Sequence, residues 1–442
     1  MARNKDLHVF DIEAVRKQFP GLDAGSVCLN NGSGALVYRG AIERQVVCCV
    51  YIVRTMSAPH MNLRGLDSKS LVDVRERTAQ YKKLASFMNA EPDEIGKRSF
   101  IRGHSIPRCS CLIQFLLAFG PSTTGLSRSL AASLLPNLNA DSEIIISVLC
   151  HEADVTACVA MAKTLGISIK WWIPAGGMGN NKDPKLSLET LRPLLSPKTR
   201  LVCCGHVSNI TGTIENVKEI ADLVHTIPDA LIWVDGVAWA PHRPIDVKQL
   251  GVDFYVFSWY KVFGPHIAQI YARRDVQKRY LTSLNHYFFD PTALHVRLGL
   301  GNSCIELEHA VTPIINYLAD DIGWDALIAH EEVITAEILG YLTAHPDLYT
   351  VYGSQSADPN VRVSLISFTV NGIASDKVAE VIHETSSFRL ITGDCWSPRT
   401  VHDVLGLPEY GIIRTSLVHY NTVDEMKAFV QKLDEVVHTM KQ

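Results

Sequence analysis

The chain contains the segment Asp253-Phe254-Tyr255-Val256-Phe257-Ser258-Trp259-Tyr260-Lys261-Val262-Phe263-Gly264-Pro265-His266, an apolar run of strand type that Gly264-Pro265 stops. Aromatic and apolar residues surround its single lysine, Lys261, so the ammonium group is expected to be partly desolvated. Desolvation disfavours the charged form and makes a neutral, nucleophilic amine more accessible. A lysine that attaches to a carbonyl group needs this state. A surface lysine at the end of a strand is the alternative interpretation.

A second strand upstream ends in an acid. The segment Ala230-Leu231-Ile232-Trp233-Val234-Asp235-Gly236-Val237 is an apolar run that ends at Asp235. Two buried strands that end in a carboxylate and a lysine are typical of a pyridoxal 5'-phosphate (PLP) site. In such a site the acid pairs with the pyridinium nitrogen and the lysine holds the aldehyde.

The residues around these two side chains resemble a known family. Asp235–His242 (Asp-Gly-Val-Ala-Trp-Ala-Pro-His) and Ser258–His266 are similar to motifs of the fold-type I PLP enzymes of the class V aminotransferase group, above all its cysteine desulfurase-like branch. The order and spacing of the motifs agree from about Asn30 to Tyr420. The resemblance implies a PLP-dependent transferase-like α/β fold, with a large domain whose mainly parallel sheet is covered by helices and a smaller C-terminal α+β domain.

Three parts are expected along the chain: an N-terminal segment, residues 1–35, that packs on the small domain; the large PLP-binding domain, residues 36–300; and a linking helix with the small domain, residues 301–442. The sequence pattern agrees with this division. Strand-like segments at 144–150, 167–174, 201–207, 231–235, 254–258 and 267–273 alternate with helical patterns at 155–165, 188–195 and 217–225. This βαβ rhythm predicts a mainly parallel sheet with its site at the strand ends.

Composition excludes several classes of function. The 442 residues are 47% hydrophobic and 20% charged, with a formal net charge of −4, as in an ordinary globular protein. No basic cluster points to nucleic acid, and no apolar stretch is long enough to cross a membrane. The eleven cysteines lack the spacing of a zinc site, so we expect reduced thiols, no metal and a cytoplasmic protein.

The resemblance assigns a cofactor-binding role to residues spread over the large domain. Lys261 would attach PLP and later move protons, and Asp235 would keep the ring nitrogen protonated. His151 would stack on the ring, and Asn209 would bond its phenolic oxygen. The phosphate would be bound by Thr123, Thr124, Ser258 and Tyr260. For Thr123 and Thr124 the pattern itself agrees, because small hydroxyl residues at a helix start present free N–H groups to a phosphate.

The resemblance also implies a substrate site and a partner. Arg414 would grip the α-carboxylate of a small amino-acid substrate, a task that suits the bidentate geometry of arginine. Asn31, in a glycine-rich loop, would lie over the substrate, and Trp396 and His242 are further candidates. Asn302 and Ser303 would reach into the neighbouring subunit's site, which implies a homodimer with shared active sites.

Three features depart from the desulfurase pattern. Ala238 stands where desulfurases carry Gln or His beside the PLP oxygen. The segment Gly96–Leu117 interrupts the region where relatives run directly into the phosphate-binding turn. In Gly393-Asp394-Cys395-Trp396, Cys395 falls one place short of the desulfurase nucleophile, and Trp396 occupies or adjoins that place. An aromatic residue there resembles desulfurase-like proteins without persulfide chemistry, such as a fungal ustiloxin-pathway enzyme that decarboxylates aspartate and adds the resulting enamine to an aldehyde.

The sequence therefore predicts a PLP-dependent lyase or carbon–carbon bond-forming enzyme that acts on an aspartate-like L-amino acid, with an aldehyde as co-substrate. The candidates for holding a second carboxylate or the aldehyde are His242, Arg243, Arg399 and His419. Cysteine desulfurase or selenocysteine lyase activity with Cys395 as nucleophile is the first alternative. Transamination and a PLP-binding pseudoenzyme are the others.

Overall fold

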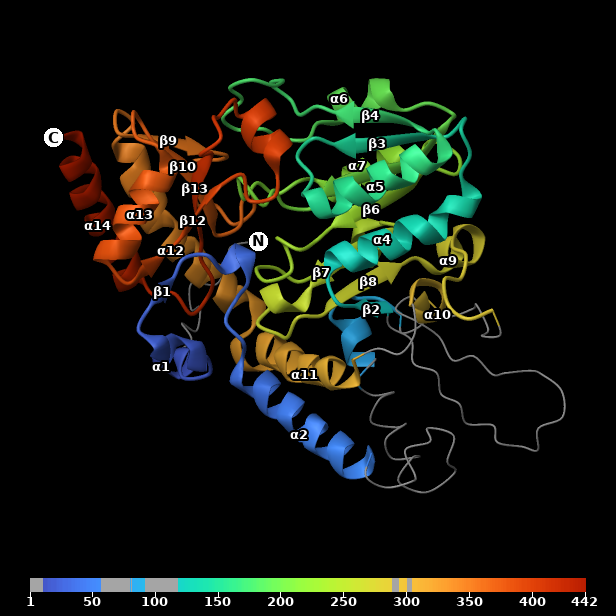
Figure 1. The fold of residues 1–442 in the computed structure, drawn as a ribbon, viewed down its shortest axis with the longest axis horizontal. Coiled ribbons are helices and arrows are strands. Elements are labelled where there is room, and N and C mark those ends of the chain that lie inside the picture. The colour runs from blue at the N-terminus through green and yellow to red at the C-terminus, as the bar shows by residue number, and fades with distance from the viewer. Residues whose placement is uncertain (1–10, 57–79, 81, 92–117, 288–293, 300–303) are drawn as a thin grey trace, which may run out of the picture.

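The computed structural model describes residues 11–56, 80, 82–91, 118–287, 294–299 and 304–442 (Figure 1). The predicted partner-site residues Asn302 and Ser303, and the Gly96–Leu117 segment, lie outside the described residues. Within the described ranges, no helix combines the length and the apolar character that crossing a bilayer requires.

A sheet of seven strands forms the centre of the large domain among the described residues. Its order is β2-β8-β7-β6-β5-β3-β4. Strand β8 runs antiparallel to both of its neighbours, and the other neighbouring strands are parallel, which confirms the mainly parallel sheet. The strands are β2 (Ala118–Gly120), β3 (Glu143–Ser147), β4 (Ser168–Trp172), β5 (Thr199–Gly205), β6 (Leu231–Asp235), β7 (Phe254–Ser258) and β8 (Ala268–Ala272).

The strands read as unbroken apolar runs because both faces of the sheet are covered. Along β6, Ile232 and Val234 belong to the core on one face, whereas Leu231 and Trp233 belong to the core on the other. Residues of α4 (Thr123–Leu134), α5 (Glu152–Leu165), α9 (Arg274–Tyr280) and α10 (Leu294–Leu298) line the second core. Residues of α6 (Leu188–Leu191), α7 (Val217–Val224), α8 (Val247–Leu250) and α11 (Ile305–Asn316) line the first.

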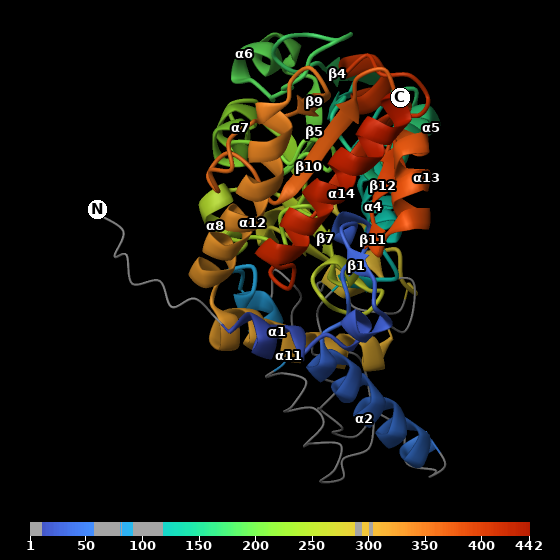
Figure 2. The ribbon, with the colours of Figure 1, turned by 90° about the vertical axis from the view of Figure 1, so that its left-hand side faces the viewer.

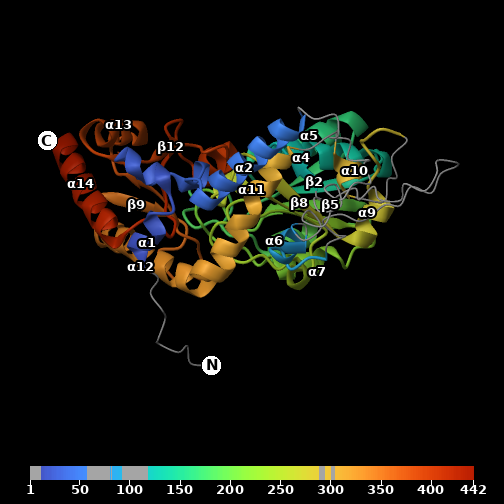
Figure 3. The same cartoon turned by 90° about the horizontal axis from the view of Figure 1, so that it is seen from below.

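Helix α11 continues the chain towards the C-terminal domain and packs on α2 (Arg39–Met56), as Figures 1 and 3 show. Short 3-10 helices join the larger elements: η3 (Leu135–Asn137), η4 (Arg192–Leu194) and η5 (Trp259–Lys261). Two single π-helical segments, η6 (Tyr317–Ile322) and η7 (Arg399–Val404), lie in the C-terminal third of the chain.

The C-terminal domain is built on an antiparallel sheet of order β12-β13-β10-β9 (Figure 2). Its strands are β9 (Tyr349–Tyr352), β10 (Leu365–Val370), β12 (Ile391–Gly393) and β13 (Ile412–Ser416), and its helices are α12 (Trp324–Ala344), α13 (Ser375–Thr385) and α14 (Val423–Lys441). Helix α14 begins with a capping box, a local pattern of Thr422 followed by Glu425 three residues later. The Thr422 hydroxyl accepts the Glu425 N–H, and the Glu425 carboxylate accepts the Thr422 N–H.

The N-terminal segment joins the two domains. It contains α1 (Ile12–Arg16), η1 (Pro20–Ala24), β1 (Val27–Cys28) and η2 (Asn31–Ser33), and β1 pairs in parallel with β11 (Phe388–Arg389) of the C-terminal domain. Phe19 is fully buried between rings from both domains, with its ring centroid 5.8 Å from that of Phe263 and 4.7 Å from that of Tyr420. Phe263 follows Lys261 by two residues, so this aromatic cluster supports the predicted cofactor lysine.

Replacing Phe19 with alanine should leave a cavity in this cluster and lower the free energy of unfolding by about 3–5 kcal/mol. Thermal unfolding measures the effect as a lower melting temperature. The matched control is Tyr287→Ala, because Tyr287 is 98% exposed and its loss should change stability by less than about 0.5 kcal/mol. Equal melting temperatures for the two variants would contradict this account of the cluster.

Candidate active site

Lys261 and Asp235 come from two neighbouring strands that run in the same direction. Strands β6 and β7 pair with Asp235 opposite Val256, so the two strands end at the same edge of the sheet. Beyond β7 the chain turns through η5, which ends at Lys261 and buries its side chain. Burial lowers the pKa of both Lys261 and His151, and the Asp235 carboxylate acts on both groups against this shift. The predicted acid, amine and ring-stacking histidine therefore face one space.

The pKa of the Lys261 amine is lower than that of an ordinary lysine. Burial and, to a smaller extent, the Arg414 guanidinium lower its pKa to about 8, although Asp235 and Cys395 partly oppose the shift. An ordinary lysine titrates at about 10.4. The desolvation expected from the sequence is therefore present, and the neutral amine becomes accessible at a moderately alkaline pH.

His151 caps helix α5 just beyond the end of β3. Its Nδ1 accepts the Ala153 N–H at 3.0 Å, which leaves the proton of the neutral ring on Nε2. Burial lowers the pKa of His151 to about 4, and the Lys261 ammonium acts in the same direction. A neutral, flat imidazole at a strand end suits the stacking role predicted for it.

Three of the four predicted phosphate ligands, Thr123, Thr124 and Ser258, lie at the start of α4. The hydroxyls of Thr123 and Ser258 lie 2.6 Å apart, although one comes from α4 and the other from the end of β7. Thr124 follows on the first turn of the helix, and Tyr260 stacks on the ring of His266 with centroids 5.0 Å apart. Hydroxyl groups at the N-terminus of a twelve-residue helix form a site that favours a phosphate dianion.

Arg414 is a buried cation without a carboxylate partner among the described residues. It lies on β13 and is 2% exposed. Its Nη1 donates to the Asn209 carbonyl at 2.9 Å, and its Nη2 donates to Ser33 Oγ at 3.0 Å and Asn30 Oδ1 at 3.3 Å. Within the part of the chain that the structure describes, its Nε has no hydrogen-bond partner. A buried charge is costly unless it is paired, so this guanidinium is suited to an anionic ligand.

The loop that follows β12 turns Cys395 inward and Trp396 outward. The Cys395 side chain is 7% exposed, whereas that of Trp396 is 72% exposed. The Lys261 and Arg414 charges both act on the Cys395 thiol, which places the thiol in the same space. Burial nevertheless raises the pKa of this thiol. Trp396 as a substrate-binding residue stays a prediction, since the residue is largely exposed to solvent in the single chain.

Hydrogen bonds fix this loop in place. The Asn209 amide donates to the Cys395 carbonyl at 3.0 Å and accepts from the Ser397 hydroxyl at 2.9 Å. The Glu152 N–H donates to the Trp396 carbonyl at 2.9 Å, and the Glu152 carboxylate pairs with Arg399. Asn209, predicted to bond the PLP phenolic oxygen, is thus also the residue that links the loop to Arg414.

Two predicted substrate ligands are engaged elsewhere. The Asn31 amide is buried and donates to the Ser416 carbonyl at 2.9 Å. His242 is buried with its Nδ1 2.9 Å from Glu331 of α12. Both therefore stay predictions.

The sequence did not single out Asn30, Ser33 or Asp154 as site residues. Asp154 follows His151 by three residues on the helix that His151 caps, and this spacing is the signal that could have identified it.

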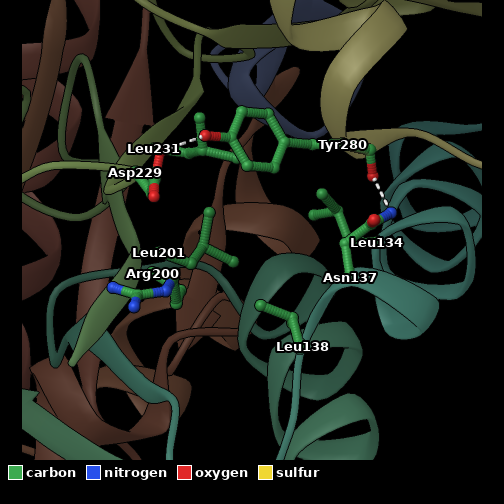
Figure 4. Close-up of a pocket in the computed structure, with 8 residues that line it drawn as sticks. All are labelled: Leu134, Asn137, Leu138, Arg200, Leu201, Asp229, Leu231 and Tyr280. Atoms are coloured by element: carbon green, nitrogen blue, oxygen red, sulfur yellow. Dashed lines mark hydrogen bonds between the residues drawn. The ribbon is translucent and has the colours of Figure 1, made fainter.

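A separate cavity of about 130 Å³ lies at the other end of the sheet (Figure 4). Its lining includes Leu201 and Leu231, which lie near the amino ends of β5 and β6. Its polar groups bond to the protein: the Tyr280 hydroxyl donates to Asp229 at 2.7 Å, and Asn137 donates to the Tyr280 carbonyl at 2.7 Å. The cavity is therefore remote from the Lys261 site, and these polar groups of its lining already have hydrogen-bond partners in the protein.

The residues at the strand ends fit PLP. An amine of lowered pKa, a carboxylate, a neutral imidazole and a hydroxyl-rich helix start correspond to the aldehyde, ring nitrogen, ring face and phosphate of the cofactor. Lys261 would attach it, Asp235 would pair with its nitrogen, and Thr123 and Ser258 would bind its phosphate.

Comparisons with known proteins agree with this geometry. The family model described as Aminotransferase class-V matches residues 118–429. Over 431 residues the chain is 44% identical to the cysteine desulfurase-like protein ustD of Aspergillus flavus, covering 97% of this chain and 91% of ustD. It is 48% identical to the nonribosomal peptide synthetase-like enzyme fsqF of Aspergillus fumigatus, but it spans only 27% of the length of that protein. The crystal structure of the cysteine desulfurase CsdA from Escherichia coli superposes with a TM-score of 0.78 at 21% identity, covering 98% of this chain and 100% of CsdA, and so shares the fold.

The lowered pKa of Lys261 predicts how cofactor attachment depends on pH. Only the neutral amine attacks the aldehyde, so the rate at which PLP attaches to the apo-protein should rise with pH and level off above about 8. Rapid mixing followed by visible absorbance measures this rate. Lys261→Arg keeps the positive charge but should not form the yellow imine, so borohydride treatment should leave no cofactor attached to this variant. A transition near the pKa of an ordinary lysine would contradict the assignment.

Proposed function

The chain belongs to the class V aminotransferase family of PLP-dependent enzymes, and from that premise we propose that it is a lyase that forms a carbon–carbon bond. Its substrate is an aspartate-like L-amino acid. The β-carboxylate leaves as carbon dioxide, and the β-carbon then forms a bond with the carbonyl carbon of an aldehyde. With aspartate the products are carbon dioxide and a γ-hydroxy amino acid, so that atoms balance and no redox partner is needed.

The observation that carries the proposal is the state of Arg414. This guanidinium is buried, its Nε has no partner among the residues described, and its charge acts on Lys261. The α-carboxylate of an amino acid supplies the missing anion and orients the Cα beside the lysine. A substrate without an α-carboxylate would leave the charge buried and unpaired.

Bound PLP supplies an electron sink for the bonds at the substrate Cα. The protein residues supply binding and proton transfer. Lys261 holds or releases a proton at Nζ close to neutral pH because its pKa is lowered to about 8. Asp235 would hold the positive charge at the ring nitrogen of the bound cofactor.

The state of Cys395 disfavours persulfide chemistry. A thiol attacks as its thiolate, and burial raises the pKa of this one. Its backbone carbonyl is bonded to Asn209, which restricts the movement that a mobile nucleophile needs. Cysteine desulfurase activity remains the second candidate, because the thiol lies within the influence of both Lys261 and Arg414.

The proposed site for the β-carboxylate or the aldehyde includes Arg399. Of the four candidates from the sequence, Arg399 lies beside the Cys395 loop, at the start of η7, where it pairs with Glu152 and stacks on Trp171 at 4.6 Å. The other three are bonded within the protein interior: His242 and Arg243 pair with Glu331, and His419 bonds the Tyr317 hydroxyl.

We also propose that the enzyme works as a homodimer in the cytoplasm. An exposed apolar face on α2, made by Ile42, Val46, Val47 and Val50, suits a second copy of the chain. The cysteines among the described residues are all free thiols, as expected in a reducing compartment.

Arg414→Lys should raise the KM for the amino-acid substrate about 10- to 100-fold, because lysine cannot form the bidentate contact with a carboxylate. Steady-state kinetics with the amino acid varied measures the effect. Arg200→Lys serves as the matched control, since Arg200 lines the remote cavity and its replacement should leave KM unchanged. An unchanged KM in Arg414→Lys would remove the main support for the proposal.

The reaction itself is tested with aspartate labelled at the β-carboxylate and benzaldehyde as the probe aldehyde. We expect labelled carbon dioxide and an equal amount of 2-amino-4-hydroxy-4-phenylbutanoate, detected by mass spectrometry. Cys395→Ala should retain this activity, because the thiol takes no part in it. Sulfide release from cysteine that disappears in Cys395→Ala, without carbon dioxide from aspartate, would establish the desulfurase instead.

A further inference from the structure

Asp154 is a completely buried acid beside the predicted cofactor site. It lies in the first turn of α5, three residues after His151, and its side chain has no exposure to solvent. The Ser127 hydroxyl of α4 donates to its Oδ1 at 2.7 Å. The mechanism proposed above gives Asp154 no role, although the residue contacts α4, the helix at whose start the phosphate site is predicted.

The second oxygen of Asp154 lacks a donor. Oδ2 is buried without a hydrogen-bond partner among the described residues. Side chains alternate along β6, so Asp235 lies on the same face as Leu231 and Trp233, which is the face that α5 covers. The Asp235 carboxylate at the end of this strand also raises the pKa of the buried Asp154, in agreement with a contact between the two acids. Two carboxylates only accept hydrogen bonds, so such a contact is stable only if one of them carries a proton. Ser127 already occupies Oδ1, and a proton on Oδ2 would give the contact its missing donor.

The surroundings decide which acid holds the proton. Asp235 Oδ1 accepts the Val237 N–H at 2.8 Å, a bond that favours its charged form. Among the described groups that act on Asp154, the ionisable ones are the Asp235 carboxylate and the Cys150 thiol, and neither is cationic. Burial and the Asp235 charge together raise the pKa of Asp154 far above that of an ordinary aspartate.

We infer that Asp154 is a positioning residue: its Oδ2 carries the proton and donates it in a hydrogen bond to Asp235, which holds that carboxylate in place for the ring nitrogen of PLP. The inference rests on the cofactor site and not on the identity of the amino-acid substrate. Asparagine at this position keeps a donor of the same shape, whereas leucine keeps the volume and removes the donor.

The proton is tested on the apo-protein by infrared difference spectroscopy at neutral pH. Subtracting the spectrum of Asp154→Asn from that of the natural protein should reveal the C=O stretch of one protonated carboxyl group. Its absence would overturn the inference. This measurement needs neither PLP nor substrate, so it is separate from the carbon dioxide assay and stays informative whichever reaction the enzyme catalyses.

The positioning role is tested by titrating the apo-proteins with PLP. Asp154→Asn should bind PLP within about 3-fold of the natural protein, and Asp154→Leu about 10- to 100-fold more weakly, because Asp235 then loses a charge-assisted hydrogen bond. Equal dissociation constants for natural protein and Asp154→Leu would overturn the inference. If Asp154→Leu does not fold, Asp154→Ala takes its place in the titration.

Glu215 offers a matched control. It is a second buried acid, and burial raises its pKa to about 8. Glu215→Gln should therefore also remove a protonated carboxyl band, but it should leave the dissociation constant of PLP unchanged, since Glu215 bonds the Leu186 N–H and not Asp235. A weakening as large as that of Asp154→Leu would show that loss of any buried acid has this effect, and would overturn the specific role of Asp154.

Discussion

The parallel pairing of β6 with β7 is the constraint on which the site depends. Because the two strands run in the same direction, the acid that ends one and the lysine that follows the other emerge at one edge of the sheet. A slip of one residue between them would turn Asp235 to the opposite face. His151 beyond β3 and the start of α4 lie at the same edge, so the sheet brings together groups that are up to 138 residues apart in the chain (123 to 261).

Much of this arrangement can be read from the sequence, because buried parallel strands appear as apolar runs whose ends are marked by polar residues. Asp235, Lys261 and Arg414 all stand at or within such runs, and the structure brings them into one space. The family resemblance then supplies the cofactor. The capping pattern at Thr422 is local, so it too can be predicted from a few residues.

Features that depend on contacts between distant segments could not be predicted. The direction of β8 is invisible in its composition, since an antiparallel strand buried on both faces is as apolar as a parallel one. The inward turn of Cys395 depends on bonds to Asn209. In the N-terminal glycine-rich loop, the Asn31 amide bonds to the Ser416 carbonyl, whereas the Asn30 side chain accepts a hydrogen bond from Arg414. These different partners depend on the tertiary fold. Asp154 looked like an ordinary helix residue because its significance comes from Asp235 on another element.

The backbone at the loop has a consequence for protein engineering. Cys395 and Trp396 both adopt a left-handed conformation, with φ of 47° and 61°, which side chains other than Gly, Asn and Asp adopt at a cost. A library of substitutions at these two positions is therefore limited first by backbone geometry. Asn and Gly tolerate this conformation best, whereas β-branched replacements should destabilise the loop whatever their effect on catalysis.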